Sequence, residues 1–422
     1  MSVQCWQSFF TLKLKLTNNM KKKLLLLLCF VTFLTQAQTG IFQGKIIDRT
    51  TNESVPFANI IALQTTQGVI SNEDGVFKFY IPSSVKTIEI SSMGYLSQQF
   101  EVTAFDSTFQ TIYLAVDEIA LEEVIVTNKP INQILAGILD NSKMQLDKSI
   151  KLETYYREFV RVNNKYSKFA DGLIDFYLKP KRKTKIEANL IVKQSRAIQL
   201  AEKEEIEQNG KMDLSELDSF FDIQKAADGF FNYELVERIS GKKAPENYDF
   251  ELRSQKDQDG NTVEIIYVTP KPKVEDALLT GKITYDPVNK IILDIDLKMS
   301  EKHKQHVKMR NVLVFKFAVH DIQIKQTYKF VNGKYIPSYK KSIVDLHIVF
   351  GKKMNDRIMC VSDLVVTNFE DNVTNLPEKN SYFTERSLYL NGVNFTENFW
   401  ETSNALPLSE NEERILQTLK IK

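Results

Sequence analysis

One pair among the four histidines of the chain has a spacing that could hold a metal. His303 and His306 lie three residues apart, so their rings would share one side of a helix but point to opposite faces of a strand. The neighbouring run 312–318 is typical of a strand, and no third ligand is apparent. We therefore interpret this segment as a basic, solvated loop and predict no metal site.

Two acids on one expected strand could support hydrolysis. Asp294 and Asp296 lie two residues apart, so on a strand their carboxylates would project from one face about 7 Å apart. That separation suits paired-carboxylate hydrolysis. The opposite face would carry the apolar residues Ile291, Leu293, Ile295, Leu297 and Met299. We therefore expect both acids to face water, and keep an envelope hydrolase acting on glycans or peptides as a third hypothesis.

The motifs of other common chemistries are absent from the sequence. It contains no His-Glu-x-x-His zinc motif, no Gly-x-Ser-x-Gly nucleophile elbow and no glycine-rich phosphate-binding loop. We predict that the protein is not an enzyme and has no catalytic, cofactor-binding or metal-binding residues.

The composition is that of a folded and nearly neutral chain. The 422 residues include 55 Lys and Arg against 54 Asp and Glu, and 43% are hydrophobic. Such fractions are typical of globular proteins, and the length predicts two or three domains. A net charge of +1 lacks the basic excess of nucleic-acid-binding proteins, so we predict no nucleic-acid partner.

The N-terminal segment is expected to direct export. The basic run Lys21–Lys23 leads into the uncharged stretch Leu24–Leu34, and a small residue, Ala37, follows. A basic region, a short apolar region and a small residue at the cleavage point are typical of a secretory signal peptide. We interpret residues 1–37 as leader and signal peptide, with Met20 as the better start. The predicted location is the periplasm or the outer membrane.

The expected mature chain offers neither a disulfide nor a membrane helix. After cleavage Cys360 would be the remaining cysteine, which excludes an intramolecular disulfide. No later stretch approaches eighteen consecutive apolar residues, so we predict no transmembrane helix in the mature chain.

The first folded domain is expected at residues 40–116 as an all-β sandwich. Turn signals recur every 8–12 residues between short β-rich runs, a rhythm typical of sandwiches. Phe77, Phe79 and Ile81 alternate with polar residues, which puts a pair of phenyl rings on one face. Glu73 and Asp74 belong to a tight-turn sequence, which we expect to be solvated rather than to bind calcium.

Four motifs in this domain follow a known order: Gly44–Asp48, Val55–Ile60, Ser71–Phe77 and Met93–Tyr95. Their order resembles that of the carboxypeptidase-like regulatory domain, a transthyretin-like (prealbumin-like) sandwich common in envelope proteins of bacteroidete bacteria. Asn72 stands where the family usually has Asp. The resemblance implies a structural or docking module without the catalytic residues of carboxypeptidases.

Residues 117–130 are expected to link this sandwich to a second domain. The string 121–127 resembles the segment that follows the same sandwich in TonB-dependent outer-membrane receptors, where an extended strand pairs with a periplasmic partner by edge addition. An ordinary closing strand or linker is the favoured alternative. The candidate partner-docking strand consists of Leu121, Glu123, Val124, Ile125, Val126 and Thr127.

Residues 131–422 are expected to form an α+β domain with a long antiparallel sheet. Apolar residues recur at helical spacing from Ile131 to Leu139, directly after Pro130. Hairpin signals such as Asp286–Asn289 then separate strand-like runs. Ser409 and Glu412 form a capping-box pattern before a short C-terminal helix. Helices and an antiparallel sheet in one domain make an α+β layer arrangement.

This second domain also carries two resemblances. The hairpin Gly281–Asp286, running into 291–299, is similar to the half-barrel sheets of lipoprotein carriers. The string Tyr155–Glu158 after an amphipathic helix resembles the uncharacterised C-terminal region of proteins that begin with this sandwich. The expected strands are rich in aromatic residues, which could line an apolar site or simply pack in the core: Tyr155, Tyr156, Phe159, Phe169, Phe176 and Tyr177.

The leading hypothesis is a non-catalytic, exported envelope protein that docks to an outer-membrane or periplasmic partner or binds a ligand. The alternative is a half-barrel carrier of an apolar or lipid ligand. A sheet concavity that is lined by apolar side chains and open to solvent would favour carriage. A sheet face fully covered by the helix Ile131–Leu139 would exclude it.

Overall fold

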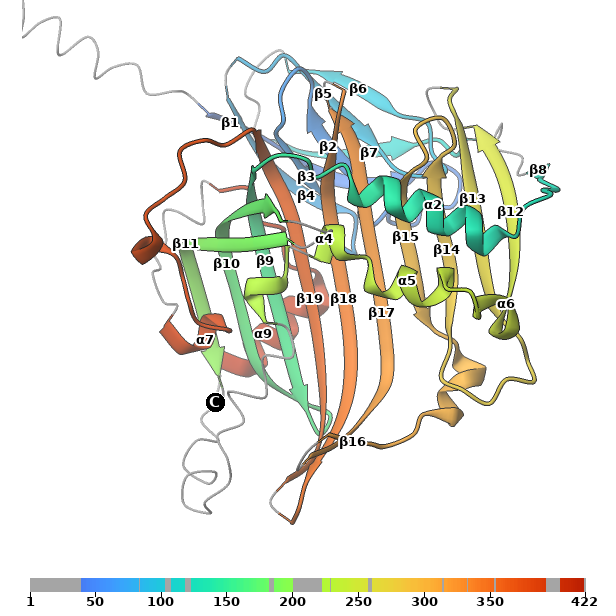
Figure 1. The fold of residues 1–422 in the computed structure, drawn as a ribbon. Helices are drawn as coiled ribbons and strands as arrows, with labels where there is room; N and C mark the ends of the chain where they lie inside the picture. The colour runs from blue at the N-terminus through green and yellow to red at the C-terminus, as the bar shows by residue number, and fades with distance from the viewer. Residues whose placement is uncertain are drawn as a thin grey trace, which may run out of the picture.

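Figure 1 shows the fold of the chain in a computed structural model. The structure describes residues 39–82, 84–102, 108–117, 123–181, 186–199, 222–227, 229–256, 260–312, 315–331, 333–352, 354–391 and 403–420. The predicted leader, residues 1–37, and Leu121 of the predicted docking strand lie outside these ranges.

The N-terminal part is a sandwich of two sheets, as the sequence predicted. One sheet has the strand order β4 (Val76–Pro82), β1 (Thr39–Asp48) and β7 (Phe109–Leu114), and the other has the order β3 (Gly68–Ile70), β2 (Asn59–Ala62), β5 (Thr87–Ser91) and β6 (Gln98–Glu101). Phe77, Phe79 and Ile81 are fully buried between the sheets, so the alternation in the sequence identified the core face correctly.

The rest of the chain builds one 12-stranded sheet, whose strands pair antiparallel. Its outer strands are β11 (Ile186–Gln199) at one edge and β8 (Glu123–Val124) at the other, and β16 (Arg310–Val312) pairs with β17 beside the main path. Between the edges the order is β10 (Lys165–Pro180), β9 (Ile150–Val162), β19 (Met354–Asp371), β18 (Lys334–Phe350), β17 (Phe315–Val331), β15 (Ile291–Met299), β14 (Leu279–Asp286), β13 (Thr262–Pro270) and β12 (Tyr248–Lys256). A sandwich followed by an α+β unit with a long antiparallel sheet is therefore the observed fold class.

Within the described part of the chain, the helices are few and mostly short. They are α2 (Ile131–Lys143), α4 (Gly229–Asn232), α5 (Glu234–Ser240), α6 (Ala244–Asn247), α7 (Leu388–Asn391) and α9 (Glu410–Lys420), with 3-10 turns η2 (Ile223–Lys225), η3 (Glu301–His306) and η4 (Lys379–Ser381). Pro130 is the N-cap of α2, so this helix begins where the sequence predicted. Within the described ranges, no helix combines the length and the apolar character needed to span a membrane.

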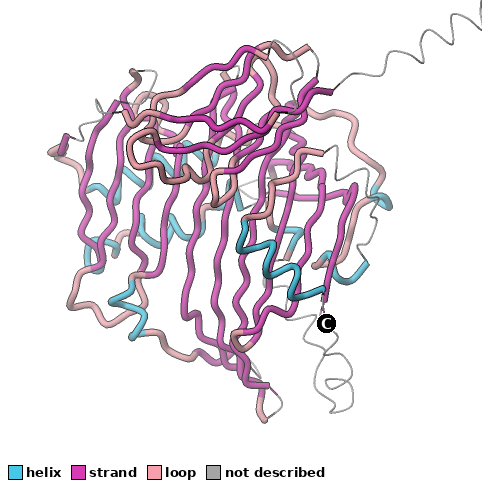
Figure 2. The backbone as a smooth tube through the Cα atoms, turned by 180° about the vertical axis from the view of Figure 1, so that it is seen from behind, coloured by secondary structure: helices cyan, strands magenta, loops and turns pink. Residues whose placement is uncertain are grey.

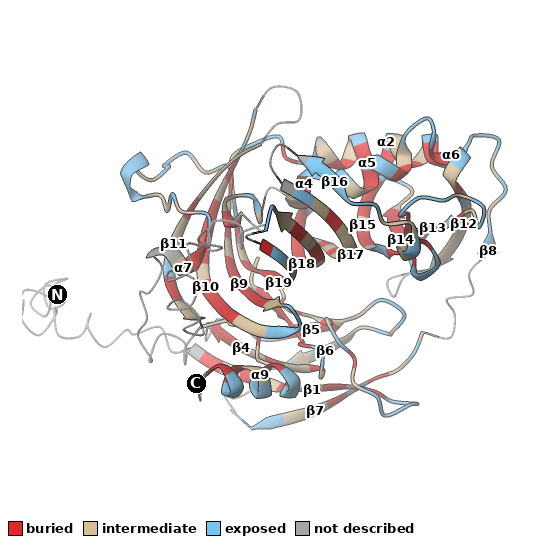
Figure 3. Ribbon diagram, turned by 90° about the horizontal axis from the view of Figure 1, so that it is seen from below, coloured by how far each residue is buried: buried red, intermediate tan, exposed pale blue. Residues whose placement is uncertain are grey.

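Different elements cover the two faces of the large sheet (Figure 3). We call the face that carries Tyr156 and Leu364 the helix face, because these residues share a core with Leu135 of α2 and Val236 of α5. We call the face that carries Tyr155 the sandwich face, because Tyr155 packs with Ile70 of the sandwich. The view from behind shows the sandwich across one end of this second face, with α9 beside it (Figure 2). Neighbouring residues of one strand thus contact different layers, as the two-residue period requires.

Candidate functional site

The two histidines lie in a 3-10 turn rather than in a solvated loop. His303 is buried, its Nδ1 lies 3.0 Å from Ser300 Oγ, and its Nε2 lies 3.3 Å from the carbonyl oxygen of Lys271. The prediction that this segment is solvated was therefore wrong for His303, because both ring nitrogens have partners within the fold. Among the described residues, no group of three or more His, Cys, Asp or Glu is arranged to hold a metal ion.

The two acids of β15 differ in exposure. Asp296 is exposed, as predicted, but Asp294 is only 6% exposed, so its expected contact with water was wrong. Asp294 pairs across the sheet with the buried Thr284 and lies on the sandwich face. Burial raises its pKa to about 6; the nearby positive charges of Lys325 and Lys282 oppose this rise, and Asp296 adds to it. The sandwich covers this part of the strand, since Met93 contacts Thr284.

The predicted docking strand closes one edge of the large sheet. Glu123 and Val124 pair with β12, and the Ile125 amide donates to the carbonyl oxygen of Leu252 at 2.8 Å. Val124 is 63% exposed and Val126 is 93% exposed, whereas Ile125 packs against the main core. Thr127 is half-buried, and its hydroxyl accepts a hydrogen bond from the Lys129 amide. Glu123 and Val124, which were predicted to lie in a linker, thus form the strand at one edge of the sheet.

A cavity of about 530 Å³ lies on the helix face, between the central strands and α4–α5. Its volume falls within the range of ~300–1,000 Å³ found for small-molecule sites. Five strands contribute the apolar residues Tyr156, Ile295, Ile322, Ile324, Val344 and Leu364 to its lining, and Ala226, Tyr233, Leu235 and Val236 contribute from the helical side. These residues alternate with residues of the sandwich face, so the long strands themselves build the apolar floor.

Polar groups interrupt this floor at defined places. Ser342 and Ser362 are buried and pair with each other across β18 and β19. Gln326 is also buried, and its amide donates to the carbonyl oxygen of Gly229 at 2.9 Å. Lys340 is half-buried, and its ammonium donates to the carbonyl oxygen of Ala226 at 3.2 Å. Close to the floor, the Tyr156 hydroxyl donates to the buried Glu158 carboxylate at 2.6 Å. The cavity is therefore amphipathic rather than purely apolar.

The aromatic residues that motivated an apolar site are mostly core residues. Only Tyr156 of that set lines the cavity. Phe159 and Phe169 pack on α9 through Leu416 and Leu419. Phe176 belongs to the core beneath the helices. The aromatic content of the strands thus predicted the core, whereas aliphatic residues of β15, β17, β18 and β19 form most of the cavity floor.

The sandwich face carries a row of charges that crosses eight adjacent strands at one register. From β14 to β11 this charged row reads Lys282, Asp296, Lys325, Lys341, Asp363, Arg157, Asp171 and Arg196. Cations and anions alternate in this row, except where Lys325 and Lys341 are adjacent. Its five cations and three anions leave an excess of two positive charges. Opposite charges in directly opposed positions stabilise a sheet, and like charges destabilise it.

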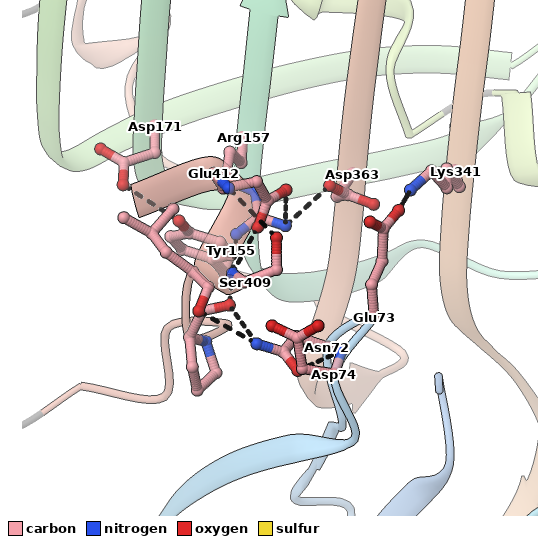
Figure 4. A network of polar contacts seen from close by, with 12 residues as sticks. Asn72, Glu73, Asp74, Tyr155, Arg157, Asp171, Lys341, Asp363, Ser409 and Glu412 are labelled. Carbon is pink, nitrogen blue, oxygen red and sulfur yellow. Dashed lines mark hydrogen bonds and ion pairs between the residues drawn. The ribbon is translucent and has the colours of Figure 1, made fainter. Parts of the chain in front are cut away.

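Arg157 is the centre of the charged row and is only 2% exposed. Its guanidinium lies 3.0 Å from the Asp363 carboxylate and 2.9 Å from the Glu412 carboxylate of α9 (Figure 4). Burial favours a raised pKa for Asp363, but the charges of Arg157 and Lys341 outweigh it and lower that pKa. Burial dominates at Glu412 and raises its pKa despite Arg157. A buried cation is thus shared between two carboxylates from distant parts of the chain.

The sandwich supplies one of the two charges that neutralise the row. Glu73 forms an ion pair with Lys341, and Glu412 supplies the second negative charge. The Phe57 ring lies over the two adjacent lysines, with the ammonium groups of Lys325 and Lys341 5.4 and 5.3 Å from its centroid. Such cation–π contacts offset part of the repulsion between the lysines. The row is therefore the surface on which the sandwich and α9 dock.

The turn 72–75 is part of this interface, so the expectation that it is solvated holds for the exposed Glu73 but not for the rest of the turn. Asn72 is buried, and its amide group donates to the carbonyl oxygens of Pro407 and Leu408 at 3.3 and 3.1 Å. Its side-chain oxygen accepts the amides of Asp74 and Val76 at 2.9 Å each. The Asp74 carboxylate accepts the first amide of α9, from Glu410, at 2.7 Å, and so stabilises the positive end of the helix.

Exchanging Asn72 for aspartate, the usual residue of the resembled family, is expected to lower the free energy of unfolding by about 1–3 kcal/mol. Aspartate cannot donate to the two carbonyl oxygens and would place a negative charge beside them. Urea unfolding at pH 7 measures the difference. The exposed turn residue Asn52 provides the control, since Asn52→Asp is expected to change stability by less than about 0.5 kcal/mol.

The predicted capping box is present and has a second role. The Ser409 amide donates to the Glu412 carboxylate at 2.7 Å, and the Glu412 amide lies 3.3 Å from the Ser409 hydroxyl. These two hydrogen bonds start α9, as the sequence predicted. The same carboxylate holds Arg157, so Glu412 joins helix capping to the docking of α9 on the sheet.

Comparison with known proteins identifies the sandwich. Residues 42–126 match the model of the CarboxypepD_reg-like domain. A stretch of 112 residues is 27% identical to the TonB-dependent receptor P3 of Formosa agariphila. This match covers 26% of the present chain and only 11% of the receptor, so most of the receptor has no counterpart in the match. The relationship is compatible with an envelope-associated binding module.

Two solved structures have partial similarity to the chain. One is a DUF1329 family protein from Desulfovibrio piger, with a TM-score of 0.21, 12% identity, and coverage of 58% of this chain and 95% of that chain. The other is a lipovitellin structure titled for its lipid–protein interactions, with a TM-score of 0.23, 9% identity, and coverage of 55% of this chain and 26% of that chain.

The family match to residues 42–126 agrees with the motif order and the fold of the sandwich. The chain carries an N-terminal CarboxypepD_reg-like domain.

Proposed function

We propose that the chain is an exported, non-catalytic binding protein of the cell envelope that holds a small ligand with an apolar body. The observation that carries this proposal is the amphipathic cavity on the helix face, with an apolar floor built by five strands. A concave, mostly apolar site with a few placed polar groups is typical of small-molecule binding.

The placement of α2 supports ligand binding. This helix packs against β12, β15 and α5, whereas much of the cavity floor lies on β9, β19, β18 and β17. Full coverage of the sheet face by α2 would have excluded carriage of a ligand. Instead, α2 covers a part of the sheet beside the cavity. Lining residues such as Lys225, Asn232 and Arg238 are exposed, which gives the cavity contact with solvent.

The sandwich has a supporting role in this proposal. It docks on the opposite face of the same strands, where Asp363 is adjacent to the cavity residue Leu364 and Arg157 is adjacent to Tyr156. Interdomain contacts on one face thereby fix the strand segments whose other face forms the floor. A rigid floor lowers the entropic cost of binding a ligand.

Binding without chemistry is part of the proposal. Asp294 and Asp296, the two acids considered for hydrolysis, lie on the sandwich face, and neither lines the cavity. Export is supported by the leader pattern at residues 20–37. Sequencing the N-terminus of the protein recovered from a periplasmic or outer-membrane fraction should give Gln38 as the first residue. Recovery of an uncleaved chain from the cytosol would contradict export.

Filling the cavity should abolish ligand binding. Ser342 lies in the middle of the floor and is buried, so a phenyl ring introduced by Ser342→Phe would occupy space that the ligand needs. We expect the fluorescence enhancement of Nile red, a neutral apolar probe, to saturate with the wild-type protein. The dissociation constant of the probe should rise at least tenfold in the variant.

The adjacent residue offers a matched control. Ile343 lies on the other face of β18 and does not line the cavity, so Ile343→Phe should leave Nile red binding within twofold of wild type. Circular dichroism establishes that both variants are folded. Equal binding by the wild type and Ser342→Phe would mean that the probe binds elsewhere and that the cavity is not the site.

A partner-docking role at β8 is a second candidate function. The specific observation is that β8 is the strand at one edge of the large sheet, where Val124 of β8 and Val126 just after it are exposed. Open edge strands with apolar side chains can accept a further strand. In pull-downs from envelope extracts, Val126→Asp should lose a partner that Val288→Asp retains, since Val288 is also highly exposed but lies in a hairpin turn. Identical recovery with both variants would rule out docking at β8.

A further inference from the structure

The charged residues of the cavity lining are unevenly distributed. Among the residues that the structure describes, four cationic and two anionic side chains line the cavity, a formal excess of two positive charges within this set: Lys225, Arg238, Lys340, Arg386, Asp222 and Glu234. Arg238 and Glu234 both belong to α5 and balance each other in charge. The excess within the described lining therefore belongs to Lys225, Lys340, Arg386 and Asp222, which together carry a formal charge of +2.

Three separate segments bring these cations to one end of the cavity. Lys225 lies in η2, and the Ile223 amide of this turn donates to the carbonyl oxygen of Arg386 at 3.0 Å. Lys340 reaches the same place from the sheet, since its ammonium donates to the carbonyl oxygen of Ala226 at 3.2 Å. The Gln224 side chain fixes this arrangement by donating to the carbonyl oxygens of Phe383 and Glu385 at 2.7 and 3.0 Å.

The position of Lys340 is the most informative of the three. It projects from the sheet itself, in register with Leu364 on one side and Gln326 on the other, and both of these neighbours are buried. A cation next to an apolar floor loses hydration, and convergent like charges repel each other. An anion at this end would offset both effects, and a hollow with an excess of positive charge concentrates anions.

We infer that the ligand is an anionic amphiphile whose head group is held by Lys225, Lys340 and Arg386. This inference rests on the proposed function and names the ligand class of the same cavity. The apolar body lies on the aliphatic floor formed by Ile295, Ile324 and Leu364. The head group is a carboxylate or a phosphate, since both accept charge-assisted hydrogen bonds from lysine and arginine.

The experiment compares probes that differ only in the head group. The full mature chain is titrated with cis-parinaric acid and with its methyl ester at low ionic strength, and inorganic phosphate is tested as a competitor. We expect the acid to bind about tenfold more tightly than the ester, the size of effect that a charge-assisted hydrogen bond provides. Inorganic phosphate should displace the acid only weakly, because it lacks the apolar body.

Two lysine variants locate the head group. Lys340→Met keeps the length of the side chain and removes its charge, so it should weaken binding of the acid about tenfold and leave the ester within twofold. Lys298→Met, at an exposed position on the sandwich face of β15, should change neither. Retained preference for the acid in Lys340→Met would place the head group elsewhere and overturn the assignment.

The outcomes separate this inference from the proposed function. Equal affinity for acid and ester would overturn the anionic head group while leaving the cavity as a binding site. Complete displacement of the acid by inorganic phosphate would indicate an anion site without an apolar component and would also overturn the inference. Failure of both probes and of Nile red to bind would contradict the proposed function itself.

Discussion

Replacing Arg157 by leucine is expected to lower the free energy of unfolding by about 3–5 kcal/mol, because removal of one partner leaves buried charges without compensation. The Asp363 and Glu412 carboxylates lie about the guanidinium, and Asp363 is as deeply buried as Arg157. Since Glu412 belongs to α9, the variant should also loosen this helix from the sheet. Urea unfolding measures the loss of stability, and hydrogen exchange of the α9 amides measures the loosening.

The β14 end of the charged row supplies the control. Lys282 occupies the same register on β14 and is only half-buried, so Lys282→Met should change stability by at most about 1 kcal/mol. If Arg157→Leu had an effect as small as that of Lys282→Met, the buried part of the row would not stabilise the docked sandwich and α9.

Replacing Asp294 by asparagine is expected to stabilise the protein at pH 7 by up to about 3 kcal/mol. Burial raises the pKa of this carboxyl from 3.8 to about 6, and a pKa difference of two units corresponds to about 3 kcal/mol between folded and unfolded states. At pH 7 the folded wild type must carry a buried charge beneath the sandwich. Asparagine has nearly the same shape and carries no charge.

The pH dependence of this effect has a definite sign. Between about pH 4 and pH 6 the folded state keeps the Asp294 proton that the unfolded state has lost, so the folded state binds more protons. The contribution of Asp294 to stability therefore falls as the pH rises through this window. The difference in unfolding free energy between Asp294→Asn and wild type should grow from pH 4 to pH 7, whatever the other groups contribute.

Asp296 provides the matched comparison because it lies on the same face and is exposed. Asp296→Asn should change stability at pH 7 by no more than about 1 kcal/mol, since it removes only an exposed charge opposite Lys282 and Lys325. A pH-independent difference for Asp294→Asn would show that its carboxylate is solvated in the folded protein, in contradiction to its burial.

The sequence predicted local structure better than it predicted the interface between the two parts. Alternation identified the buried face of Val76–Pro82, and helical spacing identified the start of α2 at Ile131. These features depend on neighbouring residues and on which side chains avoid water. The capping box at Ser409 and Glu412 was predicted for the same reason, because its two hydrogen bonds are local.

The charged row and the cavity depend on strand register, which local patterns do not contain. Arg157 and Asp363 are 206 residues apart, and only the register of β9 against β19 brings them together. The sequence did contain one sign of the charged row. Arg157 and Glu158 lie within an aromatic strand segment that begins at Tyr155, and charged side chains in such a buried segment need partners. Asp294 was misjudged because a strand pattern shows which face is polar but not that another domain covers that face.

The two faces of the large sheet explain how one set of strands can perform two tasks. Tyr156, Ser342 and Leu364 contribute to the cavity, while their neighbours Arg157, Lys341 and Asp363 hold the sandwich and α9. A substitution on the sandwich face could therefore weaken ligand binding without touching the ligand, because it would shift the strands of the floor. In this account the CarboxypepD_reg-like domain stabilises the strands that form the proposed binding site.

Native mass spectrometry of the mature protein purified from its own envelope tests the central claim most directly. We predict a non-covalent adduct of a small amphipathic molecule on the wild type and on Ile343→Phe, and its loss on Ser342→Phe. A bare protein mass for all three, together with no uptake of added Nile red or parinaric acid, would contradict a ligand-binding role for the cavity.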